Sequence, residues 1–274
     1  MEYSSLNELK QQVNELEAIA TQAYQNKENQ ENEKEAEHYS KIMDPVISDS
    51  FTELCKRACM ICSFLSDNFT KISWLEKALE ICDKDEEAKS LALINISNYY
   101  SKIGQFKSAA QYLEKSLKID IRLNKNSTRA ETHLSLCTMY SQMGKHESAK
   151  RQATNGIIFL QLKIKNAFVP KFDEERRRAA EKDLKLACLT FKDDIAVLAL
   201  CYHNLAIEQE FLSEFDDSIK SFLKAKLTAE DYLGDENPLT RHLSQVYTKA
   251  KTNLEAHIAK TASSGSQKSQ IFNH

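Results

Sequence analysis

Three cysteines carry the spacing in this chain that most directly suggests chemistry. Cys55, Cys59 and Cys62 are four and three residues apart, so on a helix their thiols would lie on one face. Such a row could bind a metal or take part in redox chemistry, but a structural zinc site needs four ligands. No nearby histidine or cysteine is an evident fourth ligand. We therefore interpret the three as small apolar core residues and predict no metal site and no cofactor.

Acid–base catalysis has equally few candidates. Glu208 and Glu210 are two residues apart, and carboxylates at that spacing on a helix point in different directions, which makes them a poor acid–base pair. His133 and His203 fall at helical positions that favour a packed or groove-lining role over that of a ligand. The sequence contains no glycine-rich phosphate loop, Gly-x-Ser-x-Gly, His-Glu-x-x-His or EF-hand loop. We predict that the chain is not an enzyme and has no catalytic residues.

The elements that position these side chains are predicted to be helices. The chain has 5 glycines and 3 prolines among 274 residues, about 3% against roughly 12% in average proteins. So few turn formers leave little room for the many reversals of a sheet. Composition therefore favours an all-α protein before any motif is considered.

One helix–turn–helix unit is especially clear. Its first helix has apolar residues at helical spacing from Leu93 to Ile103, and Gly104 stands at the reversal, where a positive φ is expected. The second helix places a small residue, Ala109, where two helices must come close, and a large one, Leu113, where a neighbouring unit leaves a gap. Such a unit cannot bury its apolar face alone, so it predicts a stack of similar units.

Two further copies follow. The second is centred on Gly144, and in it Ala153 replaces a large residue and Gly156 replaces an alanine, so we expect this copy to pack less tightly. The third contains Tyr202, and Ser213 takes the place of its turn glycine.

The alternation of small and large residues resembles the tetratricopeptide (TPR) repeat, a helix pair of about 34 residues. The segment Tyr232 to Thr240 is similar to the long-loop ending of kinesin-light-chain-type TPRs. A degenerate copy precedes the clear ones, with helices over Phe51–Phe64 and Phe69–Cys82 and a turn at Ser66-Asp67-Asn68. The resemblance covers roughly residues 50–260. It implies a TPR-like right-handed solenoid of antiparallel helix pairs with terminal capping helices.

The domain organisation follows from these copies. We predict three parts: an N-terminal amphipathic, coiled-coil-like helix with a polar linker, the helical solenoid with its three clear copies, and a disordered tail, over residues 1–44, 45–260 (copies near 90–123, 130–163 and 199–233) and 261–274.

The N-terminal helix leaves two alternatives open. Residues 5–25 carry a heptad pattern of apolar residues, formed by Leu6, Leu9, Val13, Leu16, Ala20 and Ala23. The helix either folds back on the first repeat as a cap or mediates self-association.

Two other boundaries are predicted near the end of the solenoid. The segment Asn166 to Pro170 breaks a helix, and Asp173 begins a new one that ends at Phe191 or continues to Leu212. A last helix over Pro238–Lys260 covers the final repeat.

Charge and cysteine content limit the classes of partner and the cellular compartment that we expect for this chain. The net charge is −3 with 28% charged residues, which gives no electrostatic preference for nucleic acid. No apolar run approaches 18 residues, so we predict no membrane span. Seven cysteines, an odd number scattered along helices, indicate reduced thiols inside a cell. We predict a cytoplasmic protein with protein partners.

The resemblance also implies where a partner binds, because the first helix of each TPR pair lines the concave groove. Carried over, the groove residues are Asn95, Asn98, Ser101 and Lys102 from the first copy, Ser135, Thr138, Ser141 and Gln142 from the second, and His203, Asn204 and Glu210 from the third. Amide side chains can bind the backbone of an extended peptide, and Lys102 suits an acidic side chain or a terminal carboxylate. Binding of a chaperone tail is disfavoured, because Leu200 and Asn204 fall where that clamp is basic.

The predicted function is therefore a protein–protein interaction adaptor or scaffold that binds a partner peptide or helix in the groove. The alternative is a structural subunit of a large cytoskeletal or ciliary (axonemal) assembly.

Overall fold

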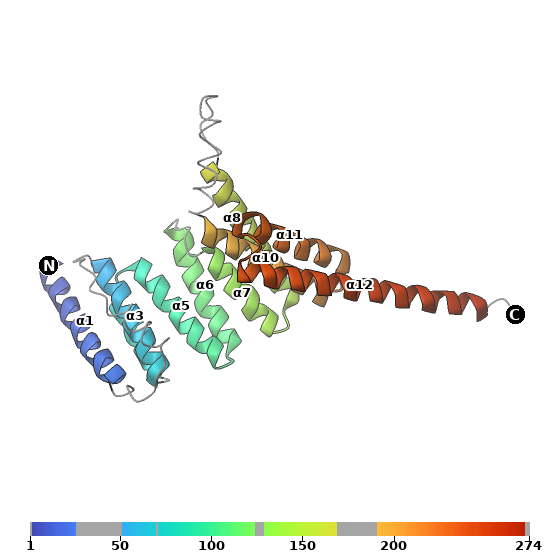
Figure 1. The fold of residues 1–274 in the computed structure, drawn as a ribbon. Coiled ribbons are helices and arrows are strands. Elements are labelled where there is room, and N and C mark those ends of the chain that lie inside the picture. The colour runs from blue at the N-terminus through green and yellow to red at the C-terminus, as the bar shows by residue number, and fades with distance from the viewer. Residues whose placement is uncertain (1, 26–50, 70, 124–128, 169–190, 272–274) are drawn as a thin grey trace, which may run out of the picture. The chain divides into compact units, whose positions relative to one another are not determined.

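The computed structural model describes residues 2–25, 51–69, 71–123, 129–168 and 191–271, and all secondary structure in these ranges is α-helix (Figure 1). The chain divides into two compact units, Met1–Lys125 and Asn126–His274. The expected helix start at Asp173 and the polar linker after residue 25 lie outside the described residues.

The first unit is built around α3 (Phe51–Phe69), which packs against α1 (Glu2–Gln25), α4 (Ser73–Ile81) and α5 (Glu86–Lys102). Helix α6 (Phe106–Arg122) pairs with α5. Part of the heptad pattern of α1, namely Leu9, Val13, Leu16 and Ala20, is buried in the same core cluster as the cysteines of α3. The apolar stripe of α1 is therefore used inside the chain, as a cap on α3.

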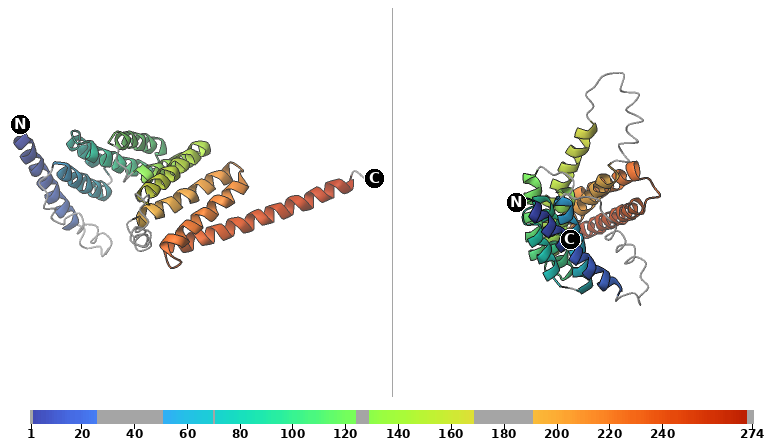
Figure 2. Two further views of the ribbon diagram at one scale, coloured as in Figure 1. Left: turned by 90° about the horizontal axis from the view of Figure 1, so that it is seen from above. Right: turned by 90° about the vertical axis from the view of Figure 1, so that its left-hand side faces the viewer.

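The second unit is built around α10 (Lys192–Phe211), which packs against α7 (Arg129–Gln142), α8 (His146–Phe168) and α11 (Phe215–Leu233). Helix α12 (Pro238–Ile271) packs on α11 and extends beyond it (Figure 2). The core of the second unit includes Leu160, Cys201, Ala229 and Leu243, one from each of four helices. Repeat-like helix pairs thus bury their faces against one another, as the sequence pattern predicted.

Three reversals in these units share one backbone geometry. After α5, Gly104 has a φ of 76° and the Gln105 amide donates to the Tyr100 carbonyl at 2.8 Å. After α7, Gly144 has a φ of 69°, and after α10, Ser213 has a φ of 62°. A bond over five residues with a left-handed residue before its donor is the Schellman ending of a helix. The predicted turn positions, including the serine, are therefore confirmed.

The second copy packs differently from expectation. A Cβ atom at Gly156 would lie 2.9 Å from Cys201 Sγ and 3.6 Å from His133 Cβ. The glycine thus allows α8 to approach α10 and α7 closely, so the expectation of looser packing is wrong at this position. A missing side chain can mark a close approach of backbones as well as a gap.

Several helix boundaries also differ from expectation. Helix α3 continues through Ser66, Asp67 and Asn68, so the reversal before α4 comes later than predicted. Helix α10 begins at Lys192, not as a continuation of an earlier helix. Helix α12 continues to Ile271 instead of ending at Lys260 before a disordered tail. Its last residues are mostly tolerated in helices, and the one glycine there costs only about 1 kcal/mol.

Candidate partner-binding surface

Four of the predicted groove residues lie together in the first unit. A hollow of about 310 Å³ is lined by Ser63, Ser66 and Asp67 of α3, by Leu75 of α4, and by Asn95, Asn98, Tyr99, Ser101 and Lys102 of α5. We call it the α3–α5 hollow. Its lining is almost entirely hydrogen-bonding, and it forms because the polar sides of two packed helices face the same opening.

The polar groups of the α3–α5 hollow are unevenly satisfied. The Asn95 amide reaches the Cys59 carbonyl at 3.4 Å. Lys102 Nζ lies 2.7 Å from Asp67 Oδ1, so the cation expected to meet a partner's acid already has one within the chain. Ser66 is 2% exposed, and its Oγ has no hydrogen-bond partner among the described residues. A buried hydroxyl without a partner is unfavourable, and here it lies in the wall of an opening.

A second hollow gathers predicted residues in the second unit. It measures about 550 Å³ and is lined by α7, the turn after it, the first residue of α8, and α10. We call it the α7–α10 hollow, and its lining residues are Cys137, Thr138, Ser141, Gln142, Gly144, His146, Asn204, Ile207, Glu208 and Phe211. Thr138, Ser141 and Gln142 are thus brought to Asn204, as the repeat pattern implied.

The α7–α10 hollow contains an acid and an aromatic ring that the sequence pattern did not assign to the groove. Glu208 is 2% exposed, and its Oε2 lies 2.8 Å from His146 Nδ1. The His146 ring stacks on Phe211 with centroids 4.3 Å apart. Burial, reinforced by the nearby charge of Glu208, raises the pKa of the Cys137 thiol to about 12. Cys137 is therefore protonated near neutral pH and is a poor nucleophile.

Three predicted groove residues lie outside both hollows. Ser135 is half-buried on α7. His203 packs against Phe222 of α11 and His242 of α12, with centroids 5.6 and 5.9 Å away, and burial lowers its pKa. Glu210 lines a separate hollow of about 210 Å³ with residues of α11 and α12, and burial raises its pKa. Glu208 and Glu210 thus face different hollows, as their two-residue spacing predicted.

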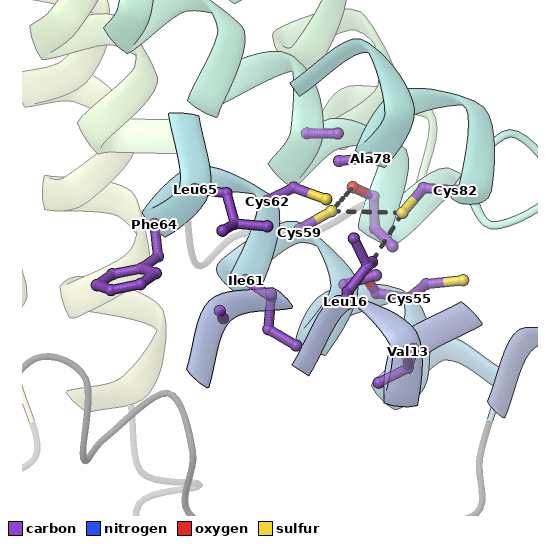
Figure 3. Packing of buried hydrophobic residues seen from close by; sticks show 14 of the residues in the cluster. Val13, Leu16, Cys55, Cys59, Ile61, Cys62, Phe64, Leu65, Ala78 and Cys82 are labelled. Carbon is purple, nitrogen blue, oxygen red and sulfur yellow. Dashed lines mark hydrogen bonds between the residues drawn. The ribbon is translucent and has the colours of Figure 1, made fainter. Parts of the chain in front are cut away.

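The cysteines of α3 lie in the core of the first unit (Figure 3), and their side chains are not in the lining of either hollow. Cys59 Sγ lies 3.3 Å from Cys82 Sγ, and Cys55, Cys59 and Cys62 are fully buried. Burial raises the pKa of Cys62 to about 12. Within the described ranges, no three metal-ligating side chains are placed to hold a metal ion. These contacts support the interpretation of the cysteines as core residues.

No helix in the described ranges combines the length and the apolarity that crossing a membrane requires.

Comparison with known proteins adds solved structures but no family model. No protein-family model matches the chain, and no curated protein matches it. The crystal structure of BtubC (BKLC) from P. vanneervenii is 12% identical, with 90% of this chain and 92% of that chain covered and a TM-score of 0.40. A Podospora anserina putative kinesin light chain with nearly identical TPR-like repeats is 14% identical, with 84% and 98% covered and a TM-score of 0.46. Neither similarity assigns this chain a function.

The helices themselves define the class of protein. Antiparallel helix pairs joined by the same left-handed turn, with small residues at their contacts, make this chain a TPR-like helical-repeat protein. Proteins of this architecture commonly mediate interactions between proteins.

Proposed function

We propose that the chain is a non-enzymatic adaptor that binds a segment of a protein partner, as an extended peptide or a helix, with the α3–α5 hollow of the first unit and the α7–α10 hollow of the second as two separate binding surfaces. The observation that carries this proposal is the α3–α5 hollow, in which the amides of Asn95 and Asn98 lie beside the buried Ser66 hydroxyl, for which no described residue is a hydrogen-bond partner. Peptide backbone groups could hydrogen-bond to the amides of Asn95 and Asn98 without any particular partner sequence, and to Ser66 once its buried hydroxyl turns toward the opening.

The serine offers a test that separates binding from stability. Ser66→Ala removes a hydroxyl that is unsatisfied in the free chain, so the free energy of unfolding should stay the same or rise by about 1 kcal/mol. If a partner supplies the missing hydrogen bond, the same change should weaken binding by a similar amount. The two effects have opposite signs, which a merely structural role for Ser66 would not produce.

The experiment is a pull-down from native extract with four baits: the wild type, Ser66→Ala, Asn98→Ala and the control Gln111→Ala on the exposed side of α6. Partner recovery is quantified, and thermal unfolding is measured for each bait. We expect the main partner to be depleted with the first two variants and retained with the control. Retention by all three variants would contradict the proposal.

A structural subunit remains the second candidate, favoured by a different observation. The second helices of the pairs expose large apolar side chains that line neither hollow: Ile121 of α6, Ile158 and Leu162 of α8, and Leu227 and Tyr232 of α11 are 43–53% exposed. Neighbours in an assembly could cover them. If Ile158→Lys loses the partners that Asn98→Ala retains, the adaptor proposal gives way to this one. A cytoskeletal or ciliary location and self-association through residues 5–25 stay predictions.

A further inference from the structure

The two hollows differ in their charge. In the α3–α5 hollow the lysine and the aspartate of the lining neutralise each other, since Lys102 pairs with Asp67. The described lining of the α7–α10 hollow contains one carboxylate, Glu208, and neither lysine nor arginine. A partner segment crossing the second hollow therefore meets an acidic site.

Glu208 retains hydrogen-bonding capacity after its contact with His146. The bond from His146 Nδ1 goes to Oε2, and no described residue donates to the other carboxylate oxygen, Oε1. A carboxylate can accept several hydrogen bonds at its two oxygens. Because Glu208 is only 2% exposed, its carboxylate is poorly solvated. A further hydrogen-bond donor that carries positive charge would stabilise this carboxylate.

Phe211 adds a second attraction for a cation. One face of its ring is covered by the stacked imidazole of His146, yet the side chain is 63% exposed. An exposed aromatic face attracts a cation, and a planar guanidinium can also stack on it. The same hollow thus presents a desolvated carboxylate and an open aromatic surface.

Resting on the proposed function, we infer that the α7–α10 hollow binds an arginine side chain of the protein partner. The guanidinium donates hydrogen bonds to Glu208 and lies against Phe211, while Asn204 and Gln142 place amide side chains in the lining of the same hollow, beside the adjacent backbone. The partner segment is therefore basic at this position. The alternative is that Glu208 only positions His146 through their hydrogen bond, and in that case the hollow would bind no ligand.

The probe is a synthetic pentapeptide, Gly-Ser-Arg-Ser-Gly with blocked ends, compared with the same peptide carrying citrulline. Citrulline preserves the shape of arginine and removes its charge. Binding to the full chain is followed by the methyl NMR signal of Ile207, which lines the hollow, and the signal is assigned with Ile207→Val. The titrations are run at about pH 8, above the ordinary titration range of histidine side chains.

Three variants accompany the wild type. Glu208→Gln removes the charge and keeps the side-chain shape. Phe211→Leu removes the aromatic ring at an exposed position, so it tests the inference even if the buried substitution impairs folding. Glu147→Gln removes one negative charge at an exposed position of α8 outside the hollow and serves as the matched control.

We expect the arginine peptide to bind the wild type about tenfold more tightly than the citrulline peptide, as is typical for hydrogen bonds to charged groups. Glu208→Gln should abolish this preference, Phe211→Leu should reduce it, and Glu147→Gln should preserve it. Equal binding of both peptides would overturn the arginine inference while leaving the peptide-binding proposal intact. If neither peptide shifts the Ile207 signal, the arginine inference and the peptide-binding proposal for this hollow are both contradicted. If Glu147→Gln also loses the preference for the arginine peptide, the preference comes from the overall charge of the protein, and the arginine inference is overturned.

Discussion

Replacing Gly156 with alanine tests how closely α8 and α10 approach. In an ordinary helix interior this change stabilises by up to about 1 kcal/mol, because glycine is a poor helix former. Here the added Cβ would lie 2.9 Å from Cys201 Sγ, and Cys201 is fully buried, so its sulfur cannot turn out into solvent. Overpacking of this kind costs about 1–3 kcal/mol. We therefore expect a net loss of about 1–2 kcal/mol in the free energy of unfolding.

The assay is urea unfolding followed by circular dichroism for a double-mutant cycle of Gly156→Ala and Cys201→Ala. In the Cys201→Ala background the sulfur is absent, so Gly156→Ala should become stabilising by up to about 1 kcal/mol. The coupling between the two sites should then fall in the range of about 0.5–3 kcal/mol found for residues in contact. Asn155→Ala, at an exposed position of the same helix, is the control and should be neutral or slightly stabilising.

The reasoning is refuted if Gly156→Ala stabilises the wild type as much as it stabilises the Cys201→Ala variant. That result would mean that the two sites do not interact and that the glycine leaves a gap after all.

Three further predictions concern other parts of the fold. Ser213→Gly should raise the free energy of unfolding in urea by about 0.5–1 kcal/mol, because an L-residue with a left-handed backbone is strained, and Gly104→Ser should lower it for the same reason. Changes of the same sign in both variants would contradict the turn geometry. Burial lowers the pKa of His203, so the unfolded chain binds a proton more readily than the folded chain, and the contribution of His203 to the free energy of unfolding is complete above about pH 6.5 and lost as pH falls below it. His203→Phe should flatten the dependence of the free energy of unfolding on pH, and an unchanged slope would exclude His203 as its source. Leu16→Ala, at a fully buried position of α1, should cost about 2–5 kcal/mol, while no loss would show that α1 does not cap α3.

Much of the fold could be predicted from local sequence patterns. The reversals at Gly104, Gly144 and Ser213 have the left-handed geometry expected from the repeat spacing, even where serine replaces glycine. Helix pairs follow from an apolar period and a turn, and both are encoded within about 34 residues of chain. The polar positions of α5 and α7 that line an opening could be predicted from the same local pattern.

Other features depended on which helices pack together and how closely. The repeat pattern suggested a gap at Gly156, but the approach of Cys201, 45 positions along the chain, makes it a tight contact. The pairing of Lys102 with Asp67 removes a cation that the sequence pattern left available. Such pairs join residues far apart in sequence, so no local period reveals them.

The sequence by itself determined that this is a chain of helix pairs with polar positions on their first helices, because helical period and turn geometry are local properties. The tertiary structure alone decided that α1 covers the core of the first unit and that His146 lies against Glu208, 62 residues away. It also decided which residues surround Glu208 and Glu210, whose two-residue spacing had already set them apart. The physical reason is that the charge and shape of a surface arise from side chains of several helices, and their meeting is set by the packing of the whole unit.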